Sequence, residues 1–170
     1  MTEKCDVAIT GGGPAGLAAA LTAGRSGARV ILAEEDFVIG GRLNAETHEV
    51  NAMPGSEFAA STVTELTSMD NVRLLPRTTV IGAYDHGVYG ALERQTDHLA
   101  DSGGKPRQVL WRVYARRAIL CAGATERPIA FGGNDRPGVM TASAMRAYAN
   151  RWAVAVGQIL GALEGFDLSG

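Results

Sequence analysis

Two short apolar runs flank a glycine-rich stretch near the start of the chain. Residues 5–10, "CDVAIT", and residues 28–35, "ARVILAEE", have the continuous apolar, β-branched character of buried parallel strands. Between them, "LAAALTAGRSG" is rich in alanine and predicts a helix. The order strand, glycine turn, helix, strand predicts a βαβ unit at residues 5–35.

The rest of the chain contains both helical and strand-like patterns. A helix with Ser56 as its cap is expected over 56–70, and Thr141 is positioned to cap another over 141–152. Short strands are expected at 71–76, 78–85, 88–94 and 110–120. His86 and Gly87 separate two of them as a hairpin turn. We therefore expect a three-stranded antiparallel meander, after which the chain returns to the parallel sheet at "AILCAG".

The glycine stretch "GGGPAG" matches the dinucleotide-binding fingerprint. Gly11 permits the tight turn after the strand, Gly13 lets a pyrophosphate approach the backbone, and Gly16 allows close helix–sheet packing. Pro14 suits a first helical turn, whose free N–H groups attract phosphate. Glu34 ends the second strand, where a carboxylate binds ribose hydroxyls and favours a ribose without the 2′-phosphate of NADP.

A second glycine pair, Gly40–Gly41, precedes Arg42. These residues are candidates for a second phosphate-side loop, in which Arg42 meets a phosphate or stacks on a base. The alternative is an ordinary glycine turn followed by a solvated arginine. The pattern alone leaves both interpretations open.

Charge and cysteine content narrow the class of protein. The chain has 16 basic and 18 acidic residues and no basic stripe, which argues against a nucleic-acid partner. Its two cysteines, far apart, form neither a disulfide framework nor a zinc motif, so no metal site is expected. No signal peptide or long apolar segment is visible. We expect a cytoplasmic protein without a membrane partner.

None of the usual catalytic side chains has a partner at a useful spacing. His86 is expected to be a turn residue, because Asp-His-Gly tolerates positive φ. His48 and His98 lie in polar segments. Cys121 ends an apolar strand, where cysteine behaves as a small apolar residue. We predict no catalytic residue in this chain.

Longer motifs carry a resemblance to known families. The strand-to-meander order and "AILCAGATERP" resemble the two-dinucleotide-binding flavoproteins, although Cys121-Ala122-Gly123 replaces their Ala-Thr-Gly signature. Gly123 would let the backbone pass near the cofactor. The runs "RLLPRTTV", "DHGVYGALER" and "ATERPIAFGGNDRPGVM" resemble the α subunit of bacterial heterotetrameric sarcosine oxidase. The expected fold is α/β, a Rossmann-like FAD/NAD(P)-binding domain with a parallel sheet, helices and the antiparallel crossover meander.

The resemblance implies a role in oxidising sarcosine to glycine with release of hydrogen peroxide. The flavin chemistry would belong to a partner β subunit within a hetero-oligomer that also contains smaller subunits. The α subunit would hold a non-catalytic NAD. Matched position by position, Ala15, Glu34, Glu35, Arg42 and Val80 would line that NAD. FAD remains the alternative ligand, because the carboxylate recognises the adenosine half that both dinucleotides share.

The resemblance fades after about Val156, and the family's α subunit is several times longer. We therefore expect a dinucleotide-binding domain over residues 1–156, a tail of unclear role over 157–170, and a truncated relative that is catalytically incomplete alone. Two alternatives stay open: a nucleotide-binding module without catalysis, and a small FAD-dependent oxidoreductase.

Overall fold

The computed structural model describes residues 1–156. They divide into a compact unit, Met1–Ala124, and a second unit that begins at Thr125. The first unit contains β1 (Thr2–Thr10), α1 (Pro14–Arg25), β2 (Val30–Ala33), a 3₁₀ turn (Gly41–Asn44), β3 (Glu49–Val50), β4 (Met53–Pro54), α2 (Gly55–Thr67), β5 (Val72–Leu75), β6 (Thr78–Tyr84), a 3₁₀ turn (Asp85–Gly87), β7 (Val88–Arg94) and β8 (Gln108–Leu120). The predicted domain of residues 1–156 thus contains two units, and the predicted tail at 157–170 lies outside the described residues.

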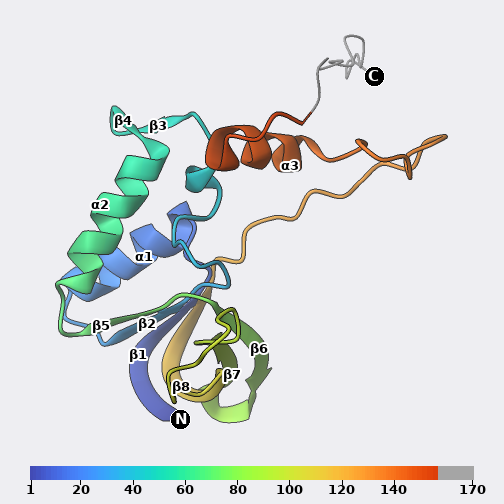
Figure 1. The fold of residues 1–170 in the computed structure, drawn as a ribbon. Helices are drawn as coiled ribbons and strands as arrows, with labels where there is room; N and C mark the ends of the chain where they lie inside the picture. The colour runs from blue at the N-terminus through green and yellow to red at the C-terminus, as the bar shows by residue number, and fades with distance from the viewer. Residues whose placement is uncertain (157–170) are drawn as a thin grey trace. The chain divides into compact units, whose positions relative to one another are not determined.

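Six strands form one mixed sheet in the order β5-β2-β1-β8-β7-β6 (Figure 1). β5, β2, β1 and β8 are parallel, whereas β6, β7 and β8 pair in antiparallel fashion. The expected α/β fold with a three-stranded meander is confirmed. β8 belongs to both parts, because it pairs with β1 on one side and with β7 on the other.

The sheet has a separate core on each face. α1 and α2 pack over β1, β2 and β5, where Leu17, Leu32 and Leu66 are fully buried. On the opposite face, Ile31 and Trp111 belong to the core that the meander covers. Because neighbouring residues of β2 point to opposite faces, burial on both sides accounts for its uninterrupted apolar sequence.

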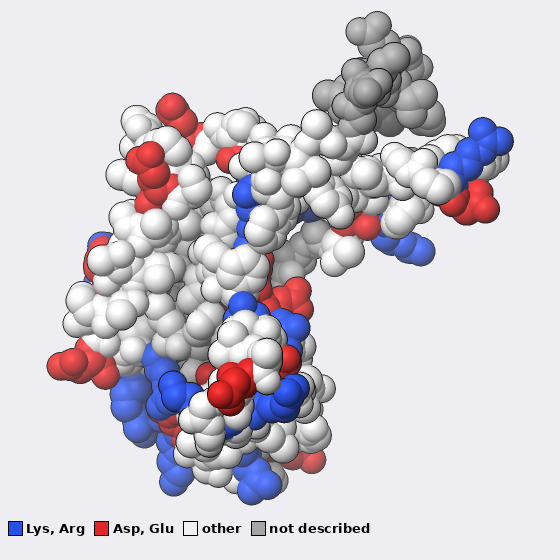
Figure 2. Space-filling view, viewed as in Figure 1, with Lys and Arg blue, Asp and Glu red and all other residues white. Residues whose placement is uncertain are grey.

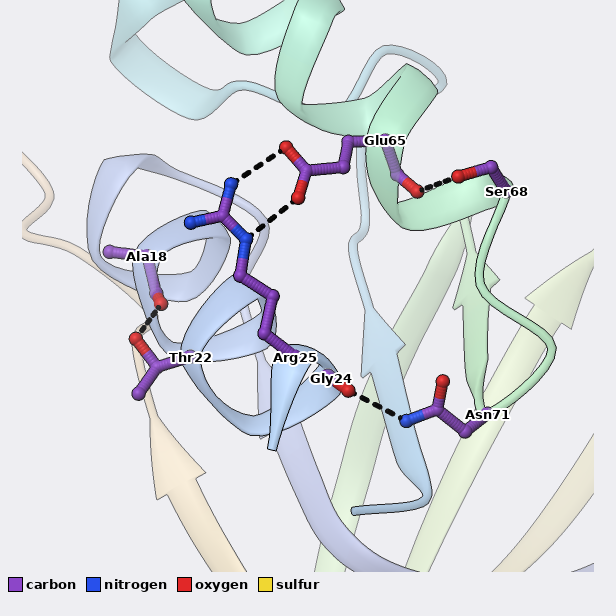
Figure 3. Close-up of polar contacts among 7 residues, drawn as sticks. All are labelled: Ala18, Thr22, Gly24, Arg25, Glu65, Ser68 and Asn71. Carbon is purple, nitrogen blue, oxygen red and sulfur yellow. Dashed lines mark hydrogen bonds and ion pairs between the residues drawn. The ribbon is translucent and has the colours of Figure 1, made fainter. Parts of the chain in front are cut away.

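Local sequence accounts for the ends of α1. Pro14 occupies the first helical position. An N–H at this position would have no acceptor within the helix, so proline costs no helical hydrogen bond there. The helix ends at Arg25, and Gly27, with φ of 82°, provides the left-handed conformation that terminates many helices. The Asn71 amide then donates to the carbonyls of Gly24 (2.9 Å) and Ala28 (2.7 Å). These bonds tie the end of α1 to the start of β5, and Figure 3 shows the one to Gly24.

α2 lies against α1 through its apolar face. Ala59, Thr62 and Leu66 recur at helical spacing and are buried. Glu65 accepts two hydrogen bonds from Arg25 of α1, at 2.7 and 2.9 Å (Figure 3). The prediction of Ser56 as the helix cap is wrong: the helix begins at Gly55, Pro54 is the N-cap residue, and Ser56 lies inside the first turn. Pro54 already has the extended conformation that an N-cap requires, without a side-chain hydrogen bond.

The hairpin turn agrees with the sequence. His86 adopts φ of 62° and ψ of 27°, a left-handed conformation that few residues other than glycine adopt. It joins β6 to β7, so the expected role of His86 as a turn residue is confirmed.

The second unit contains the short helix α3 (Ala142–Arg146) and a π-helical turn (Ala147–Arg151). Thr141 is the N-cap of α3 and accepts a hydrogen bond from the Ala144 N–H at 3.4 Å, as expected. The Glu126 carboxylate accepts hydrogen bonds from the backbone and hydroxyl of Ser143. These bonds lower the pKa of the Glu126 carboxyl. Within residues 1–156, no helix has the length and apolar character needed to cross a lipid bilayer.

Candidate functional site

A cavity of about 850 Å³ lies at the carboxyl ends of the parallel strands in the first unit. This is the edge at which open α/β sheets bind their ligands. The cavity collects segments that are far apart in sequence. It is lined by Thr10, Gly11, Gly13, Pro14, Ala15, Ala33, Glu34, Glu35, Asp36, Gly41, Arg42, Thr78, Thr79, Val80, Leu120, Cys121, Ala122, Gly123 and Ala124.

Ten of the eleven candidate site residues lie in this lining. The exception is Gly16, which lies behind the turn, where an added Cβ would collide with the Gly11 carbonyl. Asp36, Thr78 and Thr79 also line the cavity and were not predicted. Because Asp36 directly follows Glu34 and Glu35, its place in the cavity lining could have been predicted from the sequence. Thr78 and Thr79 reach the cavity because the Thr78 N–H donates to the Glu34 carbonyl at 2.7 Å, a contact between β6 and the end of β2.

The glycine loop closes against the end of β8. The Cys121 N–H donates to the Thr10 carbonyl at 2.7 Å, and the Gly11 N–H donates to the Ala33 carbonyl at 2.8 Å. Gly11 has φ of 98°, and a Cβ there would collide with the Cys121 carbonyl. Gly11 and Gly16 are therefore required by the packing of the turn itself.

Gly13 differs from these two glycines. Its backbone is extended, with φ of −72° and ψ of −173°, so any residue could adopt it. A Cβ on Gly13 would meet only the Gly41 Cα, at 3.9 Å, an ordinary van der Waals distance. The protein's own packing therefore does not require glycine at this position, although Gly13 lines the cavity.

The start of α1 presents polar backbone to the cavity. The first helical hydrogen bond runs from the Leu17 N–H to the Gly13 carbonyl, at 2.9 Å. The N–H groups of Ala15 and Gly16 precede it and have no acceptor within the helix. Together with the partial positive charge of the helix end, such groups bind phosphate.

Glu34 is buried and hydrogen-bonded to the protein backbone, which its sequence position did not indicate. Its side chain is buried, with 7% of the residue exposed. One carboxylate oxygen accepts from the Gly12 N–H at 2.5 Å, and the other accepts from the Asp36 N–H at 2.9 Å. Glu34 thus fixes the glycine loop to the end of β2. Each oxygen keeps a second lone pair for a ligand hydroxyl.

The second glycine loop packs directly on the first. Gly40 and Gly41 have φ of 146° and 55°, and a Cβ on Gly41 would lie 2.8 Å from the Gly13 Cα. This close approach brings Arg42 into the cavity lining, where its guanidinium donates to the Ala124 carbonyl at 3.0 Å. Because a guanidinium has five N–H donors, the others stay available to an anion.

Cys121 is the only cysteine in the lining, and Cys5 is buried in the meander-side core. Burial raises the pKa of the Cys121 thiol, which keeps it in the neutral form and makes it a poor nucleophile. Among residues 1–156, no cluster of three or more His, Cys, Asp or Glu side chains could hold a metal ion.

Comparisons with known proteins agree with this geometry. A family model described as FAD dependent oxidoreductase matches residues 6–68. The sarcosine oxidase subunit alpha of Rhizobium meliloti (strain 1021) is 52% identical over 91% of this chain, and that of Corynebacterium sp. (strain P-1) is 43% identical over 89%. The chain spans only 16% of the length of each of these relatives. The L-proline dehydrogenase structure from P. horikoshii superposes with a TM-score of 0.75 at 27% identity, covering 92% of this chain and 31% of that one.

The fold and the glycine-lined cavity define a dinucleotide-binding domain of the Rossmann-like FAD/NAD(P) type. Within that class, the chain is a homologue of the sarcosine oxidase alpha subunit.

Proposed function

We propose that the chain binds NAD in the cavity at the glycine loop, as the nucleotide-binding part of a sarcosine oxidase type of enzyme. In this proposal the NAD takes no part in catalysis. Oxidation of sarcosine to glycine, with hydrogen peroxide as the second product, takes place at flavins on a partner β subunit of a hetero-oligomer. The support is homology over 91% of the chain together with the shape and lining of the cavity.

The single observation that carries the proposal is the empty space beside Gly13. Gly13 has neither the positive φ nor the close packing that requires glycine at Gly11 and Gly16. A ligand that needs the Gly13 backbone bare accounts for the residue. A pyrophosphate is such a ligand, because it accepts hydrogen bonds from backbone N–H groups at the start of a helix.

The other candidate residues would then divide the dinucleotide between them. Ala15 at the start of α1 would hold the pyrophosphate, with Arg42 contributing a positive charge. Glu34 and Glu35 would bind the adenosine ribose, where their carboxylates disfavour a 2′-phosphate. Val80 would supply an apolar wall. In this non-catalytic role, bound NAD would contribute structure and stability rather than hydride transfer.

FAD is the second candidate for the same cavity. The family model that matches residues 6–68 is that of FAD dependent oxidoreductases. Bound FAD would supply an isoalloxazine ring that accepts a hydride equivalent. Mass spectrometry and the absorption spectrum of whatever dinucleotide co-purifies distinguish the two: a yellow protein that releases FAD would contradict the proposal of NAD.

The binding test compares two Gly→Ala variants of the full chain. Gly13→Ala adds a methyl group where the pyrophosphate is expected, which should weaken dinucleotide binding by about 5- to 150-fold, the equivalent of about 1–3 kcal/mol of overpacking. Gly132→Ala is the matched control, because a Cβ there meets no atom within 4 Å. Affinity for NAD and for FAD is measured by titration calorimetry.

Stability of the same two variants is measured by urea unfolding. Gly13→Ala should stay within about 1 kcal/mol of the parent, because the lower entropy of the unfolded chain offsets the poorer helix cap. Unchanged affinity for both dinucleotides in a folded Gly13→Ala protein would refute the assigned site. The role in the enzyme is tested separately, by co-expression with a β subunit and measurement of oxygen uptake on N-methylglycine.

A further inference from the structure

A second polar cavity lies in the first unit, at the opposite end of β1 from the glycine loop. Its volume is about 460 Å³, and it is lined by Lys4, Cys5, Arg29, His86, Gly87, Tyr114, Ala115 and Arg116. None of these residues lines the dinucleotide cavity. Lys4 precedes Thr10 by six residues of β1, which puts the two sites about 20 Å apart along the strand.

The register of the sheet brings the cations together. Lys4 pairs with Tyr114 across the parallel ladder between β1 and β8. Directly paired residues share a face, and so do residues two apart on one strand. Lys4, Tyr114 and Arg116 therefore project from the same face. Figure 2 shows Lys and Arg side chains gathered at the end of the sheet where the N-terminus lies.

Two other segments close the cavity. Arg29 enters from the loop that precedes β2. His86 enters from the turn between β6 and β7, which packs so tightly on β8 that a Cβ on Gly87 would collide with the Ala115 carbonyl. The turn therefore lies directly against β8 at the side of the cavity.

The positive charge is only partly neutralised. Asp6 accepts hydrogen bonds from the Arg29 backbone N–H and guanidinium, all at 3.0 Å, and so offsets that arginine. Arg116 forms an ion pair with the same carboxylate, at 3.6 Å from Nε to Oδ1, and 80% of the Arg116 side chain is exposed. Among the described residues that line the cavity, none is acidic. Lys4, Arg29 and Arg116 thus share one nearby carboxylate, that of Asp6, which leaves an excess of positive charge beside Tyr114.

We infer that this cavity is an anion-binding site that takes the phosphate group of a small molecule. Guanidinium and ammonium groups beside a hydroxyl offer donors and charge to phosphate oxygens. The volume is in the range of small-molecule sites. The inference does not depend on the proposed dinucleotide function, because the two cavities share no residue.

Inorganic phosphate is the probe, added to the ¹⁵N-labelled full chain at constant ionic strength. We expect amide shifts at residues 4–5, 86–87 and 114–116 that saturate with phosphate. Lys4→Gln and Arg116→Gln should each weaken this saturation about fivefold, the upper effect of losing one exposed ion pair. Arg107→Gln is the charge-matched control, since Arg107 is exposed and outside the cavity lining.

The amide shifts also separate this site from the dinucleotide site. Phosphate that binds at the glycine loop shifts the amides of Gly13, Ala15 and Gly16, and NAD displaces it there without affecting residues 114–116. Absence of saturable shifts at 114–116 would overturn the inference. So would equal phosphate affinity in Arg116→Gln, Lys4→Gln and Arg107→Gln, because binding would then follow net charge rather than position.

Discussion

Removal of the Glu34 carboxylate should destabilise the ligand-free protein, apart from any effect on binding. The buried carboxylate accepts hydrogen bonds from the N–H groups of Gly12 and Asp36, at 2.5 and 2.9 Å. These bonds connect the glycine loop after β1 to the segment after β2. Glu34→Ala leaves both N–H groups without that acceptor. Glu34→Gln leaves one acceptor oxygen and turns an amide NH₂ toward the other N–H.

The magnitude follows from the number of N–H groups left unsatisfied. Each buried N–H without an acceptor costs about 1–3 kcal/mol. Glu34→Gln should therefore lower the free energy of unfolding by about 1–3 kcal/mol and Glu34→Ala by about 2–6 kcal/mol. Total stabilities of domains are about 5–15 kcal/mol, so the alanine variant should be marginal. Glu35→Ala is the control, because Glu35 is exposed and contributes its main-chain carbonyl to Arg94.

The assay is urea unfolding of the ligand-free protein, followed by far-ultraviolet circular dichroism. Glu35→Ala should lie within about 0.5 kcal/mol of the parent, as surface changes do. Equal unfolding free energies for Glu34→Ala and Glu35→Ala would contradict the structural role assigned to the two hydrogen bonds of Glu34. Dinucleotide binding is measured in the same variants, and Glu34→Ala should lose about 1.5–3 kcal/mol there through the missing ribose contact.

Two further predictions concern titratable groups. Hydrogen bonds from Arg29 lower the pKa of Asp6 from 3.8 to about 2, so the ionised form is favoured in the folded state. The melting temperature of the parent should exceed that of Asp6→Asn by a constant amount above about pH 4, and the difference should shrink as pH falls toward 2. A pH-independent difference would contradict this. Burial raises the pKa of both thiols, that of Cys5 to about 11. Because Cys5 is buried and Cys121 is only half-buried, thiol reagents at pH 8 should label Cys121 first, and a saturating dinucleotide should slow that reaction. Peptide mass spectrometry measures both rates, and equal labelling of the two cysteines would count against the structure.

The first βαβ unit was predictable because its signals are local. Apolar runs, Pro14 and the glycine fingerprint each act within a few residues, and the predicted elements formed in the expected order. The helix cap at Ser56 failed for a local reason as well, since Pro54 supplied the extended conformation two residues earlier. Propensity alone ranked serine above proline at that position.

β8 could be predicted only in part. The alternation of Val109, Trp111 and Val113 with exposed residues indicated a strand with one buried face. That the same strand continues into the parallel sheet depends on its register with β1 and β7, which no local pattern contains. The cluster of Lys4, Arg29 and Arg116 was invisible for the same reason. The sequence contains no basic run, and the cluster forms because β1 pairs with β2 on one side and with β8 on the other.

The glycines show why the candidate site needed the structure as well as the motif. The fingerprint treats Gly11, Gly13 and Gly16 alike. Contacts inside the turn require glycine at Gly11 and Gly16 but not at Gly13. A substitution at Gly11 or Gly16 would therefore report on folding, whatever the ligand. Only Gly13 separates folding from binding, because its backbone is unstrained and its missing side chain borders the cavity. Gly13 is therefore the glycine whose substitution tests for a dinucleotide site in this chain.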